Sequence, residues 1–440
     1  MTNENNAYYE ILGQKPLNGE IKVAGAKNAA TKQMVASLLS PEPVILHNVP
    51  DIGDVKVTEE LIKGVGTKVE RIGPNSLRLE TPEIKTTEIL QTYSGINRIP
   101  ILLLGPLLAR EKEAKVPAMG GCRIGKRPVN FHTMGLRQMG AIIDENEKGF
   151  FATTRGLKGT HIELPFPSVG ATENMILSGC MAEGMTVIKN AAVEPEVIDL
   201  VMMLQKMGAN ISVDVDRTIM IEGEKRLHGA EHYVIPDRIE AASFAVAAIM
   251  TGGQIEVIDA RQEHMTSFFN LLKRVGAPFE IKTDRVIFGG SFDKLNPVAL
   301  ETDVHPGFMT DWQQPFVMML TQAEGISVVH ETVYERRFGY TEALKQMGAQ
   351  IQLFNECLGG KPCRFAGRGH PHSAVISGPV SLKAADIEIP DLRAGFSYLV
   401  AALAAKGKSK ITGIHYIERG YENIIDKLKV LGADIERKEG

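Results

Sequence analysis

The sequence predicts an α/β protein assembled from six copies of one module, in the order strand, helix, strand, helix, strand, strand. Three observations predict this class: a helix–glycine–strand pattern that recurs six times, a more apolar helix before each recurrence, and a short strand pair after most of them. The intervals between recurrences run from 68 to 84 residues. This period exceeds that of the common solenoid repeats, so each unit is expected to be a small α/β module.

Each recurrence reads as the last turn of an amphipathic helix, one glycine and then a strand. Glycine just past a helix end accepts the left-handed conformation in which backbone N–H groups bond to the last carbonyl groups of the helix. The stretches are LIKGVGTKV (61–69), GLRQMGAII (135–143), MLQKMGANI (203–211), LLKRVGAPF (271–279), ALKQMGAQI (343–351) and KLKVLGADI (427–435). The glycines are Gly66, Gly140, Gly208, Gly276, Gly348 and Gly432.

A second helix is expected before each recurrence. These segments are rich in Ala, Met and Leu and lack a broad polar face, which predicts burial inside the module. They are NAATKQMVASLL (28–39), RIPILLLGPLLAR (98–110), ENMILSGCMAEG (173–184), EAASFAVAAIMTGG (240–253), DWQQPFVMMLTQAEG (311–325) and GFSYLVAALAAKG (395–407).

The two ends of the chain are predicted to share one domain. Five modules end in a strand pair, whereas the sixth stops after one strand, and YYEILGQKPLNGEIKVAG (8–25) offers the missing partner. We therefore expect a first domain over residues 22–235, which carries the cysteine loop, and a discontinuous second domain over 1–21 and 236–440. A ligand site is expected between the domains, a common place for one.

Composition excludes several classes of protein. The 440 residues carry a formal net charge of -4, whereas a dedicated nucleic-acid binder is normally basic. The longest apolar run, IPILLLGPLLA, has 11 residues, and a membrane span needs about 20. The start, MTNENNAYYE, is no secretory signal. We expect a cytoplasmic protein that binds neither nucleic acid nor membrane, and the sequence leaves its oligomeric state open.

Cysteine and histidine spacing predicts no metal site. Cys122, Cys180, Cys357 and Cys363 are scattered and form no CxxC pair, which fits a reduced intracellular protein better than a zinc protein. None of the 11 histidines shows metal-ligand spacing, and no phosphate-binding P-loop is present. Neither a metal nor a cofactor is expected.

The stretch GGCRIGKRPVN (120–130) is the first candidate for chemistry. It places Cys122 behind two glycines and close to Arg123, Lys126 and Arg127. Neighbouring cations lower the pKa of a thiol, and an arginine can bind a phosphate or carboxylate with two parallel hydrogen bonds. The alternative is a basic surface loop with an incidental cysteine.

Other candidates lie at predicted helix starts and in two late loops. GAKNAA (25–30) places Lys27 and Asn28 at a helix N-terminus, which favours an anion, although a solvated lysine is the alternative. HPGFMTDWQQ (305–314) places Asp311 at the head of a buried helix, where it could simply cap the helix. Arg393 and Arg419 are candidate anion ligands or plain surface arginines.

With these motifs in view, the whole chain resembles the UDP-N-acetylglucosamine enolpyruvyl transferases of the EPSP synthase-like superfamily. Shikimate enolpyruvyl transferases share the architecture but are a weaker match. The matching stretches occur in the family's order and cover nearly the whole chain. They are GAKNAA, GPLLAR, GGCRIGKRPVNFH, PSVGATEN, IPDRIEAASF, HPGFMTDWQ, ETVYERRF, DLRAG and ERGYENIIDKL.

The resemblance implies two inside-out α/β domains of three modules each, and transfer of enolpyruvate from phosphoenolpyruvate to the 3'-hydroxyl of UDP-N-acetylglucosamine. It implies Cys122 as proton donor and Asp311 as the base that takes the hydroxyl proton. The implied phosphoenolpyruvate ligands are Lys27, Asn28, Arg127, Arg393 and Arg419. The implied sugar-nucleotide ligands are Asn28, Arg98, Arg127, Pro128, Val129, Asn130, Phe131, Asp311 and Val333. Arg337 and Asp391 are implied as supporting residues.

The chain departs from the family pattern at three places. Thr31 and Lys32 replace a Leu-Pro pair, Met119 replaces a proline, and Asn130 replaces an aspartate in the nucleotide-contact stretch. Because of Asn130, an enolpyruvyl transferase that acts on UMP stays open as an alternative. A non-catalytic nucleotide-binding paralogue is a third hypothesis, against which the intact Lys27, Cys122 and Asp311 argue.

Overall fold

The computed structural model describes residues 7–119, 129–360 and 363–440. Within these residues the chain forms two compact units. The first unit comprises residues 25–119 and 129–235, and the second comprises 7–24, 236–360 and 363–440. Cys122, Arg127 and Pro128 lie outside the described residues.

The first unit contains three sheets, with strand orders β13-β3-β5-β4, β6-β8-β7 and β11-β12-β10-β9. The four-stranded sheets each combine one parallel and two antiparallel pairs, as the predicted module requires. The strands are β3 (Val44–His47), β4 (Lys68–Gly73), β5 (Ser76–Glu80), β6 (Glu113–Pro117), β7 (Ile142–Asn146), β8 (Gly149–Thr153), β9 (His161–Glu163), β10 (Met185–Lys189), β11 (Asn210–Val213), β12 (Ile219–Glu222) and β13 (Glu231–Tyr233).

The helices of the first unit alternate between buried and outer positions along the chain. Those predicted to be buried, α1, α3 and α5, contribute a dense set of apolar residues to the core of this unit. The helices are α1 (Lys27–Ala36), η2 (Ser37–Leu39), α2 (Gly53–Val65), η3 (Gln91–Tyr93), η4 (Pro100–Leu103), α3 (Leu104–Glu111), α4 (Asn130–Gln138), α5 (Val169–Gly179) and α6 (Pro195–Lys206).

The second unit repeats this design with strand orders β15-β16-β14-β2, β17-β18-β20-β19 and β21-β22-β1-β23. Its strands are β1 (Tyr8–Leu12), β2 (Asn18–Lys22), β14 (Gln254–Ile258), β15 (Phe279–Ile281), β16 (Arg285–Gly289), β17 (Ala299–Glu301), β18 (Gly325–His330), β19 (Gln350–Phe354), β20 (Ser373–Gly378), β21 (Asp386–Glu388), β22 (Lys408–Thr412) and β23 (Asp434–Lys438). β1 pairs with both β22 and β23, so the N-terminal strand completes the last sheet.

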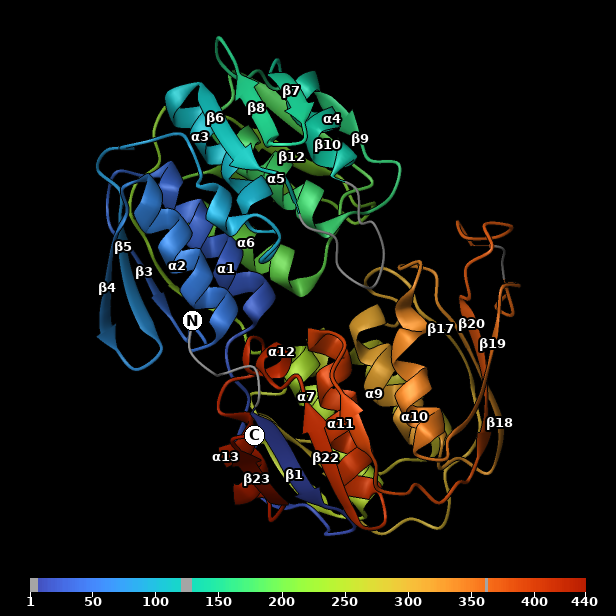
Figure 1. Ribbon diagram of the computed structural model, residues 1–440. Helices are drawn as coiled ribbons and strands as arrows, with labels where there is room; N and C mark the ends of the chain where they lie inside the picture. Colours follow the sequence, from blue (N-terminus) through green and yellow to red (C-terminus); the bar gives the residue numbers. More distant parts are fainter. Residues whose placement is uncertain (1–6, 120–128, 361–362) are drawn as a thin grey trace. The chain divides into compact units, whose positions relative to one another are not determined.

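Three helices, α7 (Arg238–Thr251), α9 (Thr310–Leu320) and α11 (Leu392–Ala404), pack against one another at the centre of the second unit (Figure 1). Every residue of α7 from Arg238 to Ile249 is buried. This explains why the helix is apolar all round rather than on one face. The other helices are η5 (Gln262–His264), α8 (Thr266–Val275), η6 (Arg337–Tyr340), α10 (Thr341–Gln346), α12 (His415–Glu418) and α13 (Ile424–Val430).

The predicted fold class is confirmed, with helices enclosed by sheets and the module repeated around each core. All six pattern glycines have positive φ, between 82° and 119°, as the helix-ending role requires. The strand β2, from the N-terminal segment expected in the second domain, pairs with β14 of the second unit, and β13 pairs with β3 of the first unit. In the described part of the chain, no helix combines the length and apolarity that crossing a membrane requires.

Candidate functional site

The helix α1 begins at Lys27, directly after Ala26. No side chain of the described residues caps this helix, and its first turn carries the positive end of the helix dipole, which favours an anion. The Lys27 Nζ atom lies 3.0 Å from Oδ2 of Asp54, and both side chains are largely buried. The carboxylate therefore holds the ammonium group at the helix start, close to the position of Asn28.

Lys32, which stands where the family has the proline of a Leu-Pro pair, has a charged partner in the structure. Its Nζ donates to the backbone oxygen of Asn28 at 2.6 Å and lies 3.8 Å from Oε1 of Glu173 on α5. Glu173 is fully buried. Burial raises the pKa of Glu173 to about 7, although the Lys32 charge opposes the rise. The Leu-Pro replacement thus supplies a counter-charge to a buried carboxyl group.

The nucleotide-contact stretch begins the helix α4. Val129 is buried and precedes the helix, Asn130 is its exposed first residue, and Phe131 is half-buried. His132 follows, and burial together with the positive charge of Arg98 lowers its pKa to about 3. The structure therefore brings Arg98 near the start of α4, beside a neutral histidine.

Asp311 is the second residue of α9, and its backbone does not take the N-cap position, which Met309 occupies. Asp311 therefore lies in the first turn of α9 and not at its N-cap position. Its Oδ1 atom instead accepts a hydrogen bond of 2.6 Å from Nη2 of Arg337. The Arg337 side chain is 1% exposed and that of Asp311 is 15% exposed, so this ion pair is largely shielded from solvent.

Arg337 also faces two further acids. Burial alone lowers the pKa of a guanidinium group, but the charges of Asp311, Asp391 and Glu331 outweigh it and raise the pKa of Arg337. Asp391 Oδ1 accepts from the backbone N–H of Ala394 at 3.0 Å, which caps the start of α11. The structure thus assembles Asp311, Arg337 and Asp391 from three separate motifs.

Glu331 is a residue that sequence reasoning missed. It is fully buried, and burial raises its pKa despite the neighbouring Arg337. Its carboxylate accepts hydrogen bonds from the Thr310 hydroxyl and the backbone N–H groups of Val333 and Tyr334. It therefore ties the head of α9 to the Val333 segment, and its place in ETVYERRF, two residues before Val333, was the only signal.

The last two predicted arginines lie on separate elements. Arg419 ends the short helix α12 and is half-buried. Arg393 is in the first turn of α11, and its side chain lies outside what the structure describes.

One group of side chains in the described residues could hold a metal ion, and spacing did not reveal it. His330, Cys357, Cys363 and His372 place one ligand atom each within 4.8 Å of one another. Burial opposes ionisation of Cys357, but the hydrogen bond from the Cys363 backbone N–H and the neighbouring polar side chains outweigh it and lower the pKa of Cys357 to about 7. The spacing, C-x5-C-x8-H, matches no common zinc motif.

Comparison with known proteins places this architecture in a family. The EPSP synthase (3-phosphoshikimate 1-carboxyvinyltransferase) family model matches residues 11–428. A UDP-N-acetylglucosamine 1-carboxyvinyltransferase of Protochlamydia amoebophila (strain UWE25) is 53% identical over 98% of this chain and 94% of its own length. The protein of the same name from Chlamydia pneumoniae is 51% identical over 97% of this chain and 94% of its own.

Solved structures share the fold at low identity. The enolpyruvyl transferase NikO from Streptomyces tendae superposes with a TM-score of 0.89 and 23% identity, covering 99% of this chain and 100% of NikO. EPSP synthase from Acinetobacter baumannii gives a TM-score of 0.73 at 20% identity, with 98% and 100% covered. From the family match and the full-length identity to these relatives, the chain belongs to the EPSP synthase family, in its group of UDP-N-acetylglucosamine 1-carboxyvinyltransferases.

Proposed function

We propose that the protein transfers the enolpyruvyl group of phosphoenolpyruvate to the 3'-hydroxyl of UDP-N-acetylglucosamine, with release of phosphate. This alkyl transfer is the first committed step of peptidoglycan synthesis and so serves cell-wall formation. The observation that carries the proposal is the 53% identity, over 98% of the chain, to a relative that bears the name of this activity. We place the reaction in the cytoplasm, because scattered cysteines fit a reducing compartment.

The residues proposed to bind phosphoenolpyruvate supply the charge that this substrate needs. Phosphoenolpyruvate carries a phosphate and a carboxylate on a small carbon frame, so several fixed cations must surround it. We assign Lys27, Arg127, Arg393 and Arg419 to these anions, with Asn28 beside them. The ion pair of Lys27 with Asp54 supports this, because it holds the ammonium group at the start of α1, where the helix dipole favours an anion.

The proposed reaction is an addition followed by an elimination. The Cys122 thiol gives its proton to C3 of phosphoenolpyruvate while the 3'-oxygen of the sugar bonds to C2, and Asp311 takes the proton of that hydroxyl. The C2–O bond to phosphate then breaks, and C3 loses a proton to restore the double bond. General acid and base groups typically accelerate such steps by about 100 to 10,000-fold each.

The contacts of Asp311 support its role as the base. The ion pair with Arg337 fixes the orientation of this carboxylate at the head of α9. Asp391 and Glu331 share the positive charge of Arg337, so Asp311 is not the sole counter-ion. The group is also 15% exposed, which leaves it accessible to a substrate hydroxyl.

The proposed sugar-nucleotide ligands are Arg98, the residues from Arg127 to Phe131, and Val333, together with Asn28 and Asp311. Relatives with 41 to 53% identity bear the sugar-nucleotide name, which favours this acceptor over UMP. Asn130 retains one acceptor oxygen but exchanges a charge for an N–H donor. A contact through its backbone would survive that exchange.

The test is phosphate release from phosphoenolpyruvate with UDP-N-acetylglucosamine or UMP as acceptor, in the wild type and in Asn130→Asp. We expect kcat/KM to favour the sugar nucleotide in both proteins. Asn130→Asp should change KM by roughly 5 to 150-fold, the equivalent of one buried hydrogen bond, and kcat by less. Phosphate release with UMP alone would instead establish the alternative acceptor, and release with neither would establish the non-catalytic paralogue.

A further inference from the structure

The second unit contains one strand connection that is far longer than its counterparts. The strands β4 and β5 are joined by two residues and so are β7 and β8, whereas 18 residues, 355–372, connect β19 to β20. Connections of this length whose described residues form no helix or strand are uncommon in compact domains and are usually functional. Cys357 and Cys363 lie in this connection, and His372 is its last residue.

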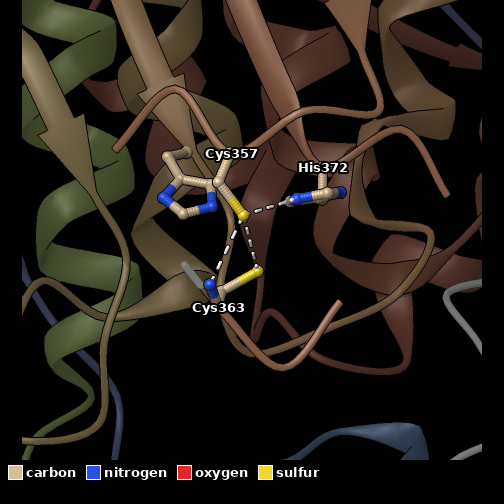
Figure 2. A group of neighbouring side chains, drawn as sticks. Cys357, Cys363 and His372 are labelled. Atoms are coloured by element: carbon tan, nitrogen blue, oxygen red, sulfur yellow. Dashed lines mark hydrogen bonds between the residues drawn. The ribbon is translucent and has the colours of Figure 1, made fainter. Parts of the chain in front are cut away.

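The cysteines and histidines of this region converge on one point. The Sγ atoms of Cys357 and Cys363 are 3.7 Å apart, and Nε2 of His372 lies 3.3 Å from Sγ of Cys357 (Figure 2). The fourth member is His330, the last residue of β18, whose ring is fully buried. The strand order places β18 next to β20, which explains how His330 reaches the connection.

These distances are those of a tetrahedral zinc site. With Zn–S near 2.3 Å and Zn–N of about 2.0–2.1 Å, the edges of a tetrahedron are about 3.8 Å between two sulfurs and about 3.6 Å between sulfur and nitrogen. The observed 3.7 Å and 3.3 Å are close to these edges. A disulfide requires a sulfur separation of about 2.05 Å, so the two thiols are not bonded to each other.

Both imidazole rings are oriented as metal ligands. Nδ1 of His372 lies 2.7 Å from the backbone oxygen of His370, and Nδ1 of His330 lies 2.9 Å from Oε2 of Glu301. Each Nδ1 therefore carries the proton and donates it, which leaves the lone pair on Nε2, the usual arrangement behind a metal-bound histidine. Nε2 of His330 is buried and has no hydrogen-bond partner among the described residues, a vacancy that a metal ion would fill.

The backbone of the connection is also shaped for this site. A Cβ atom on Gly359 would overlap both Oε2 of Glu301 and Nδ1 of His330, so only glycine lets the chain pass there. The next residue, Gly360, donates its N–H to Oε2 of Glu301 at 3.2 Å. Backbone N–H groups also approach both sulfurs at 3.4 Å, which stabilises negative charge on them.

We propose that His330, Cys357, Cys363 and His372 bind one structural Zn²⁺ ion. The ion displaces one proton from each thiol, and the two thiolates balance its charge, while the two imidazoles bind as neutral ligands. Two sulfur and two nitrogen ligands suit zinc rather than calcium or magnesium, which prefer oxygen. Four protein ligands complete a tetrahedron, so no coordination position remains for a substrate.

The ion would fasten the long connection to the sheet beside the proposed substrate residues. The N–H of Glu331, the neighbour of His330, donates to the backbone oxygen of His372 at 2.7 Å. The guanidinium group of Arg364, the neighbour of Cys363, donates to the backbone oxygen of Val333. Zinc loss should therefore loosen the Val333 segment without removing any group assigned to the chemistry.

The test measures metal content and coordination in tag-free full-length protein purified without chelators. Elemental analysis should find about one zinc per chain in the wild type and in Cys180→Ala, a control in the first unit. Cys363→Ser should retain less than a tenth of that zinc, because a hydroxyl is a poor replacement for a thiolate ligand. Equal zinc in Cys363→Ser and the wild type would overturn the proposal.

If the Cys363→Ser variant does not fold, a second measurement tests the site in the wild-type protein. Wild-type protein is stripped with a chelator under reducing conditions and titrated with Co²⁺, which reports tetrahedral thiolate coordination by its visible absorption. We expect one equivalent of Co²⁺ to bind with that spectrum and one equivalent of Zn²⁺ to abolish it. A stripped protein that takes up neither ion, or a Cys357–Cys363 disulfide in zinc-free purified protein, would refute the site independently of transferase activity.

Discussion

Replacing Glu173 by glutamine should remove a pH-dependent loss of stability from the first unit. Glu173 lies on the buried helix α5 and is fully enclosed. Neither carboxylate oxygen has a hydrogen-bond partner among the described residues, and the nearest cation, Lys32, is 3.8 Å away. A buried carboxylate with one distant counter-charge is costly to ionise.

The sign and size of the effect follow from the pKa of Glu173. Burial is the largest cause of its rise from 4.5 to about 7, Lys32 opposes it, and Glu196 and Glu194 add to it. The folded protein therefore holds this proton more tightly than the unfolded chain, so stability falls as pH rises from 4.5 to about 7 and then levels off. The total loss is roughly 3 kcal/mol, since each pKa unit corresponds to about 1.4 kcal/mol.

The assay compares melting temperatures of the wild type and Glu173→Gln from pH 5 to pH 8. Most, but not all, of that loss falls between pH 5 and pH 8. For a domain of this size, about 2–4 °C accompanies each kcal/mol, so the melting temperature of the variant should rise by about 5–10 °C relative to that of the wild type across that range. Glutamine stays neutral, so any constant cost of losing the Lys32 pair cancels in the difference. Glu183→Gln, at an exposed position after the same helix, is the control and should show almost no gain. A constant or opposite difference for Glu173→Gln would refute the reasoning.

Three further predictions concern the two sites. Asp311→Asn keeps an acceptor for Arg337 but loses the charge, so kcat for phosphate release should fall about 100-fold or more while the protein stays folded; near-normal kcat would contradict a base role. An epoxide phosphonate that resembles phosphoenolpyruvate should alkylate Cys122 selectively, and peptide mass mapping that places the label on another cysteine would exclude Cys122 as the reactive thiol. Gly359→Ala should lower zinc content and melting temperature because its Cβ has no room, whereas Gly360→Ala, with open space at that position, should change neither; equal behaviour of the two variants would count against the packing described.

The sequence by itself determined the module and its repetition, because both depend on interactions over a few residues. A left-handed residue just past a helix end favours glycine, and the six pattern glycines have the positive φ of that conformation. The apolar stretch EAASFAVAAIMTGG likewise predicted the buried helix α7. The family's motifs also identified Asp311 as a candidate, although the residue alone could not be distinguished from a helix cap.

Only the tertiary structure decided which distant segments meet. The sequence assigned the N-terminal strands to the second domain, but the register in which β2 pairs with β14 and β13 with β3 depends on strands far apart in sequence, which local pattern does not encode. The Asp311–Arg337 pair joins residues 26 positions apart, and the burial of Glu331, which orders the same region, could not be read from its place in ETVYERRF. The histidine–cysteine group was the feature hardest to predict from the sequence, because its four residues come from the end of β18 and from the connection between β19 and β20. Their convergence is set by strand order and by a glycine that lets the backbone pass, so spacing along the chain gave no indication of it.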